Sequence, residues 1–241
     1  MIILFVYLIK PQINENHSVR NNKYLSKNEL FLVLKNNTDY YNTFNKNDFK
    51  VRNINSIPEY IDKIQKSIGE FNSFHTNKLD YISHIADQKI KKINITGFNG
   101  QKCSQIKWKF GLIKNKDYEN GLPHTIKDII ILPRYVMDHF NNNELTRLLI
   151  HEKVHVYQRM FPNDIKEYLK SNNFTIYKKK DINDNIRANP DLDQYIYKRN
   201  NLIYKSKYND NPLSLLDVDP KDQNFEHPFE EMAINLAKSQ A

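Results

Sequence analysis

Cysteine is almost absent from this chain, which has one cysteine, Cys103, among 241 residues. A single thiol excludes an internal disulfide framework, and it also excludes a zinc finger built from several cysteines. We expect Cys103 to be a small buried side chain. The absence of disulfides is compatible with a reducing compartment, so a soluble protein that is cytoplasmic or virion-associated is favoured over a secreted one.

Long hydrophobic runs are also missing. The apolar segment 1–9 is too short to cross a bilayer as a helix, so we expect no transmembrane span. The segment lacks the basic start and the small-residue cleavage site of a signal peptide, because Lys10 and Pro11 follow it directly. We expect it to be a buried first strand, and a weak signal anchor is the alternative interpretation.

Negative charge is outnumbered by positive charge, with 28 acidic and 36 basic residues and a formal net charge of +8. This balance is compatible with nucleic acid, anionic lipid or the interior of a virion as a partner. The densest basic stretches are Lys178–Lys180 and residues 195–208, and no recognised nucleic-acid motif accompanies them. A solvated basic face explains both stretches without a partner.

One short motif specifies chemistry: residues 151–155 read His-Glu-Lys-Val-His, an H-E-x-x-H sequence. Histidines four residues apart project from the same face of a helix, so both imidazoles can bind one metal ion from one side. The glutamate beside the first histidine is then free to accept a proton from a metal-bound water. The motif predicts a hydrolase in which His151 and His155 are metal ligands and Glu152 is the general base.

The motif lies in a segment, 141–161, that is typical of a buried helix. Asn141 is expected to cap its start with Glu144 as the capping-box partner, and Pro162 ends it. Random matches to the motif seldom come with such a helix around them, so we interpret the match as functional. Apolar residues recur along this helix at Leu145, Leu148, Leu149, Ile150, Val154 and Val156.

A catalytic zinc site usually has three protein ligands and one open position. The metzincin continuation fails, because Gln158 occupies its glycine position and Phe161 its last histidine position. The segment Glu226–Ala233 offers glutamates instead, on a helix whose first turn contains Pro228. With this segment the chain resembles the gluzincin branch of the zincin metallopeptidases, in which a Glu-x-x-Ala or Glu-x-x-Ser signature supplies the third ligand.

The resemblance implies a ligand set and a reaction. It implies that Glu230, with Ala233 one turn later, is the third ligand of a Zn²⁺ ion, and Glu231 is the alternative. It implies hydrolysis of a peptide or protein substrate, with Glu152 delivering the proton of the water to the leaving amine. Zincins often stabilise the oxyanion with a tyrosine, histidine or arginine. The candidates for this role are Tyr195 and His227, together with Tyr197 and Arg187.

The rest of the chain predicts an α+β, zincin-like fold. Helical spacing predicts helices over 30–35, 57–68 and 76–93, so residues 1–92 are expected to form a mainly helical N-terminal region. Strands are expected over 93–96, 106–113 and 128–132, before the motif helix and a C-terminal ligand helix. Residues 93–241 are thus expected to be the zincin-like catalytic region, integrated with the first.

One of these strands has an expected role. Zincins pair an extended substrate with an edge strand upstream of the active-site helix, and by the resemblance Asp128–Leu132 is that edge strand of a small mixed sheet. An ordinary buried strand is the alternative interpretation of the same residues.

Two other functions are compatible with the sequence. The first is a catalytically inactive zincin-like protein with a structural or binding role, although such a protein has no need for Glu152. The second is a basic nucleic-acid-associated protein in which the motif is accidental, and this would bind nucleic acid in a strongly salt-dependent way.

Overall fold

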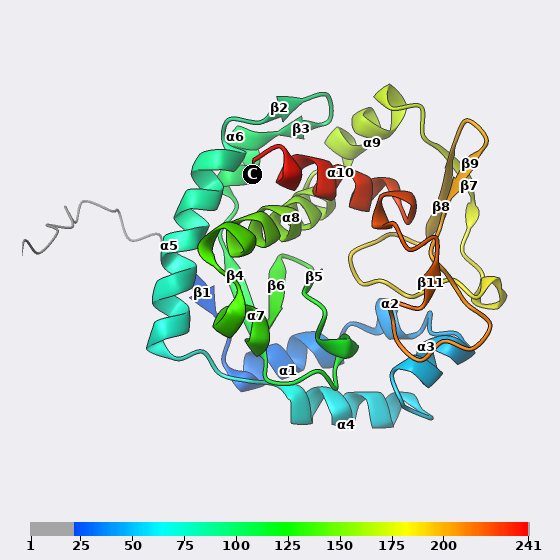
Figure 1. Ribbon diagram of the computed structural model, residues 1–241, viewed down its shortest axis with the longest axis horizontal. Helices are drawn as coiled ribbons and strands as arrows, with labels where there is room; N and C mark the ends of the chain where they lie inside the picture. The colour runs from blue at the N-terminus through cyan, green and yellow to red at the C-terminus, as the bar shows by residue number, and fades with distance from the viewer. Residues whose placement is uncertain (1–21, 241) are drawn as a thin grey trace, which may run out of the picture.

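The computed structural model describes residues 22–240, which form a mixed α and β fold (Figure 1). The segment 1–9, expected to be a first strand, lies outside the described residues. The helices are α1 (Lys27–Lys35), α2 (Thr38–Tyr41), α3 (Lys46–Val51), α4 (Ile57–Ser67), α5 (Ser73–Ile90), α6 (Gly100–Gln105), α7 (Arg134–His139), α8 (Asn142–Met160), α9 (Pro162–Ser171) and α10 (Pro228–Lys238).

The strands belong to one central sheet and three smaller ones. The central sheet contains β1 (Lys23–Tyr24), β4 (Lys109–Ile113), β6 (Ile129–Pro133) and β5 (His124–Ile126), in that spatial order. The smaller sheets are β2 (Asn94–Ile95) with β3 (Phe98–Asn99), β7 (Thr175–Lys179) with β8 (Tyr195–Arg199) and β9 (Leu202–Tyr204), and β10 (Lys207–Tyr208) with β11 (Val218–Asp219).

The central sheet is mixed. β1, β4 and β6 run parallel to one another, and β5 runs antiparallel to β6. In the antiparallel pair, His124 faces Ile131, Thr125 faces Ile130 and Ile126 faces Ile129. Among the described strands β5 has no second neighbour in the sheet, and it packs beside α8. The free edge next to the motif helix is therefore β5.

The prediction that Asp128–Leu132 forms the edge strand is wrong. β6, which contains most of Asp128–Leu132, lies between β4 and β5, and all of its residues are buried. Ile130 and Leu132 enter one hydrophobic core, whereas Ile129 and Ile131 enter another. β6 is interior because it pairs with β4 along one side and with β5 along the other, and its apolar side chains fill the cores on both faces of the sheet.

Helices cover both faces of the central sheet, so the fold has three layers (Figure 1). α1 and α4 share a core with Ile129 and Ile131, and α5 and α8 share the other with Ile130 and Leu132. The helices expected from the N-terminal sequence are present, and α1 begins with a capping box between Ser26 and Glu29. They lie on opposite faces of one sheet that also contains β1.

The strand expected over 106–113 is shorter in the structure, because α6 precedes it and β4 begins at Lys109. The strand expected over 93–96 is β2, which pairs with β3 in a small hairpin outside the central sheet. Gly97 makes that hairpin turn with a φ of +81°, and a Cβ atom there would lie 2.4 Å from Cβ of Tyr168. The turn therefore requires glycine.

The motif helix α8 is confirmed. Asn141 and Glu144 form the expected capping box, and Phe161 ends the helix directly before Pro162, the first residue of α9. α8 lies at the centre of the fold with α10 packed along it (Figure 1). α10 also begins as expected, with Pro228 in its first turn, and Ala233 is fully buried.

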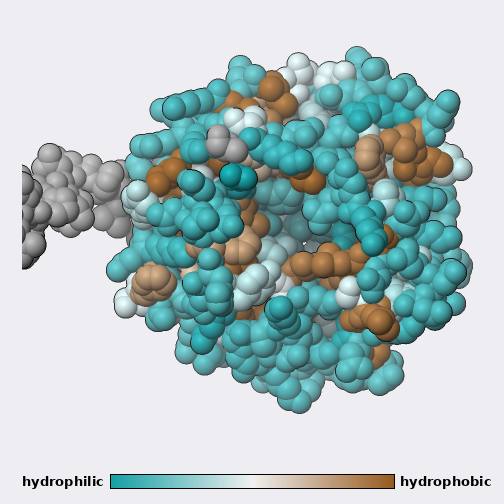
Figure 2. Space-filling model, in the orientation of Figure 1, coloured by the Kyte–Doolittle hydropathy of each residue, from teal (hydrophilic) through white to brown (hydrophobic). Residues whose placement is uncertain are grey.

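The surface is mostly hydrophilic on the face shown in Figure 2, and its hydrophobic residues form separate patches rather than one continuous area. Within residues 22–240, we find no helix with the length and apolar character needed to cross a membrane.

Candidate metal centre

Three side chains from two helices converge at the centre of the molecule. His151 and His155 project from one face of α8, and Glu230 projects from the first turn of α10. The two Nε2 atoms of the histidines lie 3.1 Å apart. The carboxylate of Glu230 lies 3.4 Å from Nε2 of His151 and 3.6 Å from Nε2 of His155. One donor atom from each residue lies within 4.8 Å of the other two.

These separations fit a zinc ion. Ligand atoms about 2.0–2.2 Å from a tetrahedral zinc lie about 3.3–3.5 Å from one another. The separation of the two Nε2 atoms is 3.1 Å, and the two oxygens of Glu230 lie 3.4 Å from His151 and 3.6 Å from His155, one oxygen to each ring, all close to that value. Two imidazoles and one carboxylate are also the donor set of several catalytic zinc sites, in which a fourth position stays open. These three residues could therefore hold a zinc ion.

Gln158 orients both halves of the ligand set. Its Oε1 atom lies 2.9 Å from Nδ1 of His155, so Nδ1 can donate a proton to it and leave Nε2 as the metal-binding atom. The same side chain donates from Nε2 to the carbonyl oxygen of Phe229, 3.0 Å away, at the start of α10. Gln158 thus fixes the ring of His155 and ties α8 to the helix that carries Glu230.

Glu231 points away from the histidines. Its carboxylate accepts a hydrogen bond from Arg199 at 2.7 Å and another from the hydroxyl of Tyr204 at 3.0 Å. Glu230 instead receives a hydrogen bond of 3.3 Å from Nδ2 of Asn189, in addition to its contacts with His151 and His155. Of the two adjacent glutamates, Glu230 is the one that lies beside both histidines.

The charges of His155 and Glu230 depend strongly on each other. Burial opposes a positive charge on His155, but Glu230 and Asp191 outweigh it and raise the pKa of His155 to about 9. Burial also opposes ionisation of Glu230, but His155 and His151 hold its pKa well below the usual range. The carboxylate is therefore ionised, and an adjacent positive charge compensates it.

Glu152 lies beside the ligand set and is 2% exposed. Its Oε2 atom is buried and has no hydrogen-bond partner among the described residues. Burial raises the pKa of Glu152 well above its usual value, and the charge of Asp191 adds to the effect. An unpartnered buried carboxylate is costly, so its presence here points to a group that acts on a ligand.

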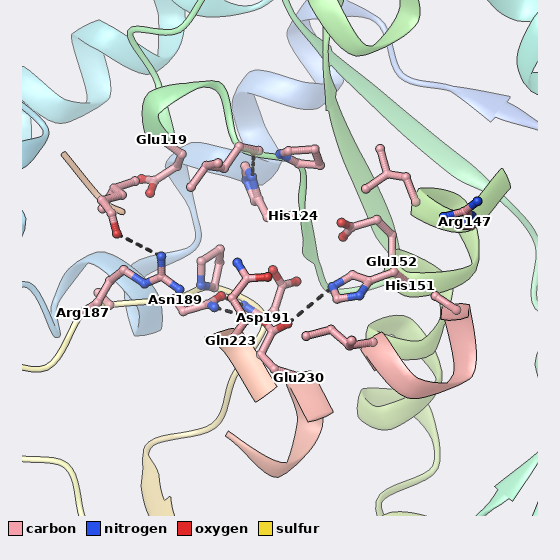
Figure 3. A pocket seen from close by; sticks show the side chains of 18 of the residues that line it. Glu119, His124, Arg147, His151, Glu152, Arg187, Asn189, Asp191, Gln223 and Glu230 are labelled. Atoms are coloured by element: carbon pink, nitrogen blue, oxygen red, sulfur yellow. Dashed lines mark hydrogen bonds and ion pairs between the residues drawn. The ribbon is translucent and has the colours of Figure 1, made fainter. Parts of the chain in front are cut away.

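A cavity of about 430 Å³ opens over this group, and His151, Glu152 and Glu230 form part of its wall (Figure 3). Figure 3 shows Asn189, Asp191 and Glu230 on one side of the cavity, with His151 and Glu152 facing them. A second cavity, of about 740 Å³, shares Arg187 and other wall residues with the first, so the two adjoin. Apolar residues of the first wall are Leu122, Pro123, Leu148, Ala188, Pro190, Leu215, Ile234 and Ala237.

The four residues considered for the oxyanion lie in different places. Tyr195, on β8, is 39% exposed and is not part of the cavity wall, and the hydroxyl of Tyr197 donates to Asp193. His227 is the N-cap of α10: its Nδ1 accepts from the backbone N–H of Phe229, and its Nε2 bonds Asp193. Both ring nitrogens of His227 are thus engaged away from the cavity.

Arg187, the fourth of these residues, does line the cavity. Its guanidinium is buried and donates to Glu226 at 2.5 Å and to the carbonyl oxygen of Leu215 at 2.9 Å. Its Nε atom has no partner among the described residues. Arg187 can therefore still donate one hydrogen bond toward a ligand.

Asp191 is a site residue that sequence reasoning missed. It lies in the loop before β8, lines the cavity, and its Oδ1 atom accepts from the backbone N–H of Thr125 at 2.7 Å. Arg159, one turn beyond His155 on α8, pairs with the same oxygen at 3.3 Å. Only the Asn189-Pro190-Asp191 turn marks this loop in the sequence, and a turn signal carries no information about a site about 40 residues away.

Lys153, the lysine inside the motif, contacts α5 and Trp108 and holds α8 in place. Nζ of Lys153 lies 2.6 Å from Oδ1 of Asp87 on α5 and 3.9 Å from the centre of the Trp108 ring. On the same side of α8, Sγ of Cys103 contacts the carbonyl oxygen of Lys153. These contacts fix how α8 is rotated, and hence where His151 and His155 point.

No protein family model, curated protein or solved structure matches this chain.

Proposed function

We propose that this protein is a zinc-dependent peptidase of the zincin type, in which His151, His155 and Glu230 hold zinc and Glu152 is the general base. The observation that supports the proposal is the convergence of the three donor atoms beside the unpartnered oxygen of Glu152. A structural zinc site is closed by a fourth protein ligand, whereas a cavity lies over this donor set.

The chain's own residues account for the proton movements of the reaction. His151, His155 and Glu230 would hold the zinc ion, which when bound would supply Lewis-acid activation of a water molecule and of the scissile carbonyl. Glu152 would accept a proton from that water through its Oε2 atom, which makes no other hydrogen bond within the described part of the chain. As the C–N bond breaks, Glu152 passes the proton to the departing amine, and the carbonyl carbon keeps the oxygen of the water.

The edge strand β5 supplies a place for the substrate backbone. Leu122 and Pro123, which directly precede this strand, and His124, its first residue, line the cavity. An extended peptide can pair with an exposed strand edge through backbone hydrogen bonds, and this mode requires no particular side chain. Because β6 is interior and Thr125 of β5 is already engaged by Asp191 and Arg159, the segment that leads into β5 has this role in the proposal.

The test separates metal binding from turnover. Glu152→Gln is expected to keep one zinc per chain and to lose about 10²–10⁴-fold in the rate of peptide cleavage, because it removes only the base. His155→Ala is expected to lose both zinc and cleavage. Glu167→Gln is a matched control, since Glu167 is exposed and outside the cavity.

Two results would contradict the proposal. If the Glu152→Gln variant cleaved peptides as fast as wild type, Glu152 would not be the base. If the wild-type protein bound one zinc per chain but cleaved no member of a diverse peptide mixture, the site would be a metal-binding module without peptidase activity.

A further inference from the structure

The free edge of β5 is closed at one residue. The two backbone groups of Thr125 are taken by side chains: its N–H donates to Asp191, and its carbonyl oxygen accepts from Nη2 of Arg159 at 3.2 Å. The hydroxyl of Thr125 joins the same network by donating to Asp191. Arg159 also donates to the carbonyl oxygen of Pro190 at 2.8 Å, so the loop 187–191 is held against the strand. An added peptide strand cannot pair with Thr125.

The edge remains open two residues earlier. Residues 123 and 125 direct their backbone groups to the same side of the strand, because strand geometry alternates with a period of two. Pro123 lines the cavity, and as a proline it presents only its carbonyl oxygen. A peptide on this edge can therefore donate one N–H to Pro123, and its next outward-pairing position, about 7 Å further along, is occupied by Asp191.

The charge at the closed end determines which terminus of a peptide fits there. Every hydrogen bond that Asp191 accepts falls on Oδ1, and Oδ2 receives none from the described part of the chain. Asp191 lines the cavity together with the carboxylates of Glu152 and Glu230. An N-terminal ammonium can donate a hydrogen bond to Oδ2 of Asp191 and pair with its charge, whereas a C-terminal carboxylate has no proton to donate there. A peptide that ends at Asp191 with its amino terminus runs antiparallel to β5.

We infer that the site acts on free amino termini: Asp191 binds the N-terminal ammonium of the substrate, and the enzyme releases one or two residues as an aminopeptidase-type exopeptidase. This inference rests on the proposed peptidase function. The remainder of the peptide leads away from Asp191 along Pro123 and has the two adjoining cavities available to it.

The experiment compares a peptide mixture with free amino termini to the same mixture after N-acetylation, with cleavage positions read by mass spectrometry. The zinc-loaded wild-type protein is expected to remove one or two residues from the free peptides and to act on the acetylated ones at least about tenfold more slowly. Internal cleavage at equal rates in both mixtures would overturn the amino-terminus inference and leave the peptidase proposal standing. No cleavage in either mixture would overturn both.

Variants give the second arm. Asp191→Asn keeps an oxygen to accept from Thr125 but removes the charge, so kcat/KM for free peptides is expected to fall at least about tenfold, mainly through KM, while that for acetylated peptides stays constant. Asp193→Asn is the matched control, because it makes the same change two residues away and does not line the cavity. Equal losses on both mixtures in the Asp191→Asn variant would mean a structural role for Asp191 and overturn the inference.

A binding measurement gives a readout that does not depend on turnover. The zinc-loaded Glu152→Gln protein is expected to bind a free hexapeptide at least about tenfold more tightly than its N-acetylated form in titration calorimetry. Equal affinities would overturn the inference.

Discussion

The ammonium group of Lys153 lies 2.6 Å from the carboxylate of Asp87, and both side chains are almost fully buried. Lys153 stands between the two histidines of the motif, on the opposite side of α8, and Asp87 belongs to α5. The indole N–H of Trp108 donates to the other oxygen of Asp87 at 2.9 Å. This buried pair holds α8 in one rotation against α5. It therefore influences where His151 and His155 point, although it touches neither of them.

Lys153→Met is expected to destabilise the protein by about 3–5 kcal/mol, because it removes the positive charge that compensates the buried carboxylate of Asp87. For a chain of this size the loss corresponds to a fall in Tm of about 6–20 °C. The double variant Asp87→Asn/Lys153→Met removes both charges and keeps an acceptor for Trp108, so it should recover most of the loss. A thermal unfolding curve for each variant checks this, and a double variant no more stable than the single one would contradict it.

Variants of Glu230, Glu231 and Gln158 are expected to differ in their affinity for zinc. Gln158→Ala keeps all three proposed ligands but removes the group that orients His155 and bonds the start of α10, so zinc affinity should fall by about 10–100-fold. Glu230→Ala removes a ligand and should fall further, whereas Glu231→Gln should bind zinc like wild type. Competition with a chelator of known affinity measures all three. A larger loss in Glu231→Gln than in Glu230→Ala would show that the wrong glutamate has been assigned.

Removal of zinc is expected to lower thermal stability, because the ion binds the folded ligand set and not the unfolded chain. Addition of a chelator should reduce the Tm of the wild-type protein and leave the Tm of His151→Ala unchanged. An equal shift in both proteins would place the stabilising metal elsewhere.

Glu119, which lines the cavity, forms a second buried charge pair with Arg52. This pair predicts how the stability of the protein changes as the pH falls. Glu119, before β5, accepts from Arg52 at 2.8 Å and from the hydroxyls of Tyr40 and Tyr60 at 2.8 and 2.6 Å. Burial alone would raise the pKa of Glu119, but Arg52 outweighs it and the pKa is lowered. The stabilisation is therefore present above the unfolded-state pKa of about 4.3 and is lost as pH falls through the lower pKa of the folded state.

Glu119→Gln should be less stable than wild type at pH 7 by about 3–5 kcal/mol. It should also lose less stability than wild type between pH 7 and pH 3, since this carboxyl no longer titrates. Urea unfolding at both pH values measures the two differences, with the exposed Glu167→Gln as the control. A variant with the same pH dependence as wild type would contradict the assignment.

The sequence made His227 a candidate catalytic residue. Because it is the N-cap of α10, we expect its substitution to change stability rather than the rate of the reaction. His227→Asn keeps a side-chain acceptor at the N-cap of α10 and should retain zinc and most activity. His227→Ala should lose about 0.5–2 kcal/mol of stability. Zinc content and peptide cleavage of both variants check this. If His227→Asn instead lost activity by several orders of magnitude while binding zinc normally, His227 would act in the reaction itself.

The sequence was informative where function and local structure depend on the same short segment. The capping box of Asn141, the apolar spacing and the two histidines all lie within α8 or at its start, so the helix and the placement of both histidines on it could be predicted together. The start of α10 was equally readable, because proline in the first turn and the Glu-x-x-Ala spacing are local signals.

The rest of the site could not be predicted because it depends on tertiary contacts. β5 has only three residues, and its position at the edge follows from its pairing with β6 rather than from its composition. Asp191 reaches the site through a loop, and its role follows from Thr125 and Arg159, which lie 66 and 32 residues away. Lys153 would be taken for a surface residue in any pattern of charges, and only the position of α5 shows that it is buried.

The thiol of Cys103 gives this chain an internal reporter. It is fully buried against the backbone of α8, and burial raises its pKa to about 12. Reaction with a thiol reagent requires both access and the thiolate, so the intact fold should resist modification. Labelling then occurs only when α6 separates from α8, and its rate records how often the central helix becomes exposed to solvent.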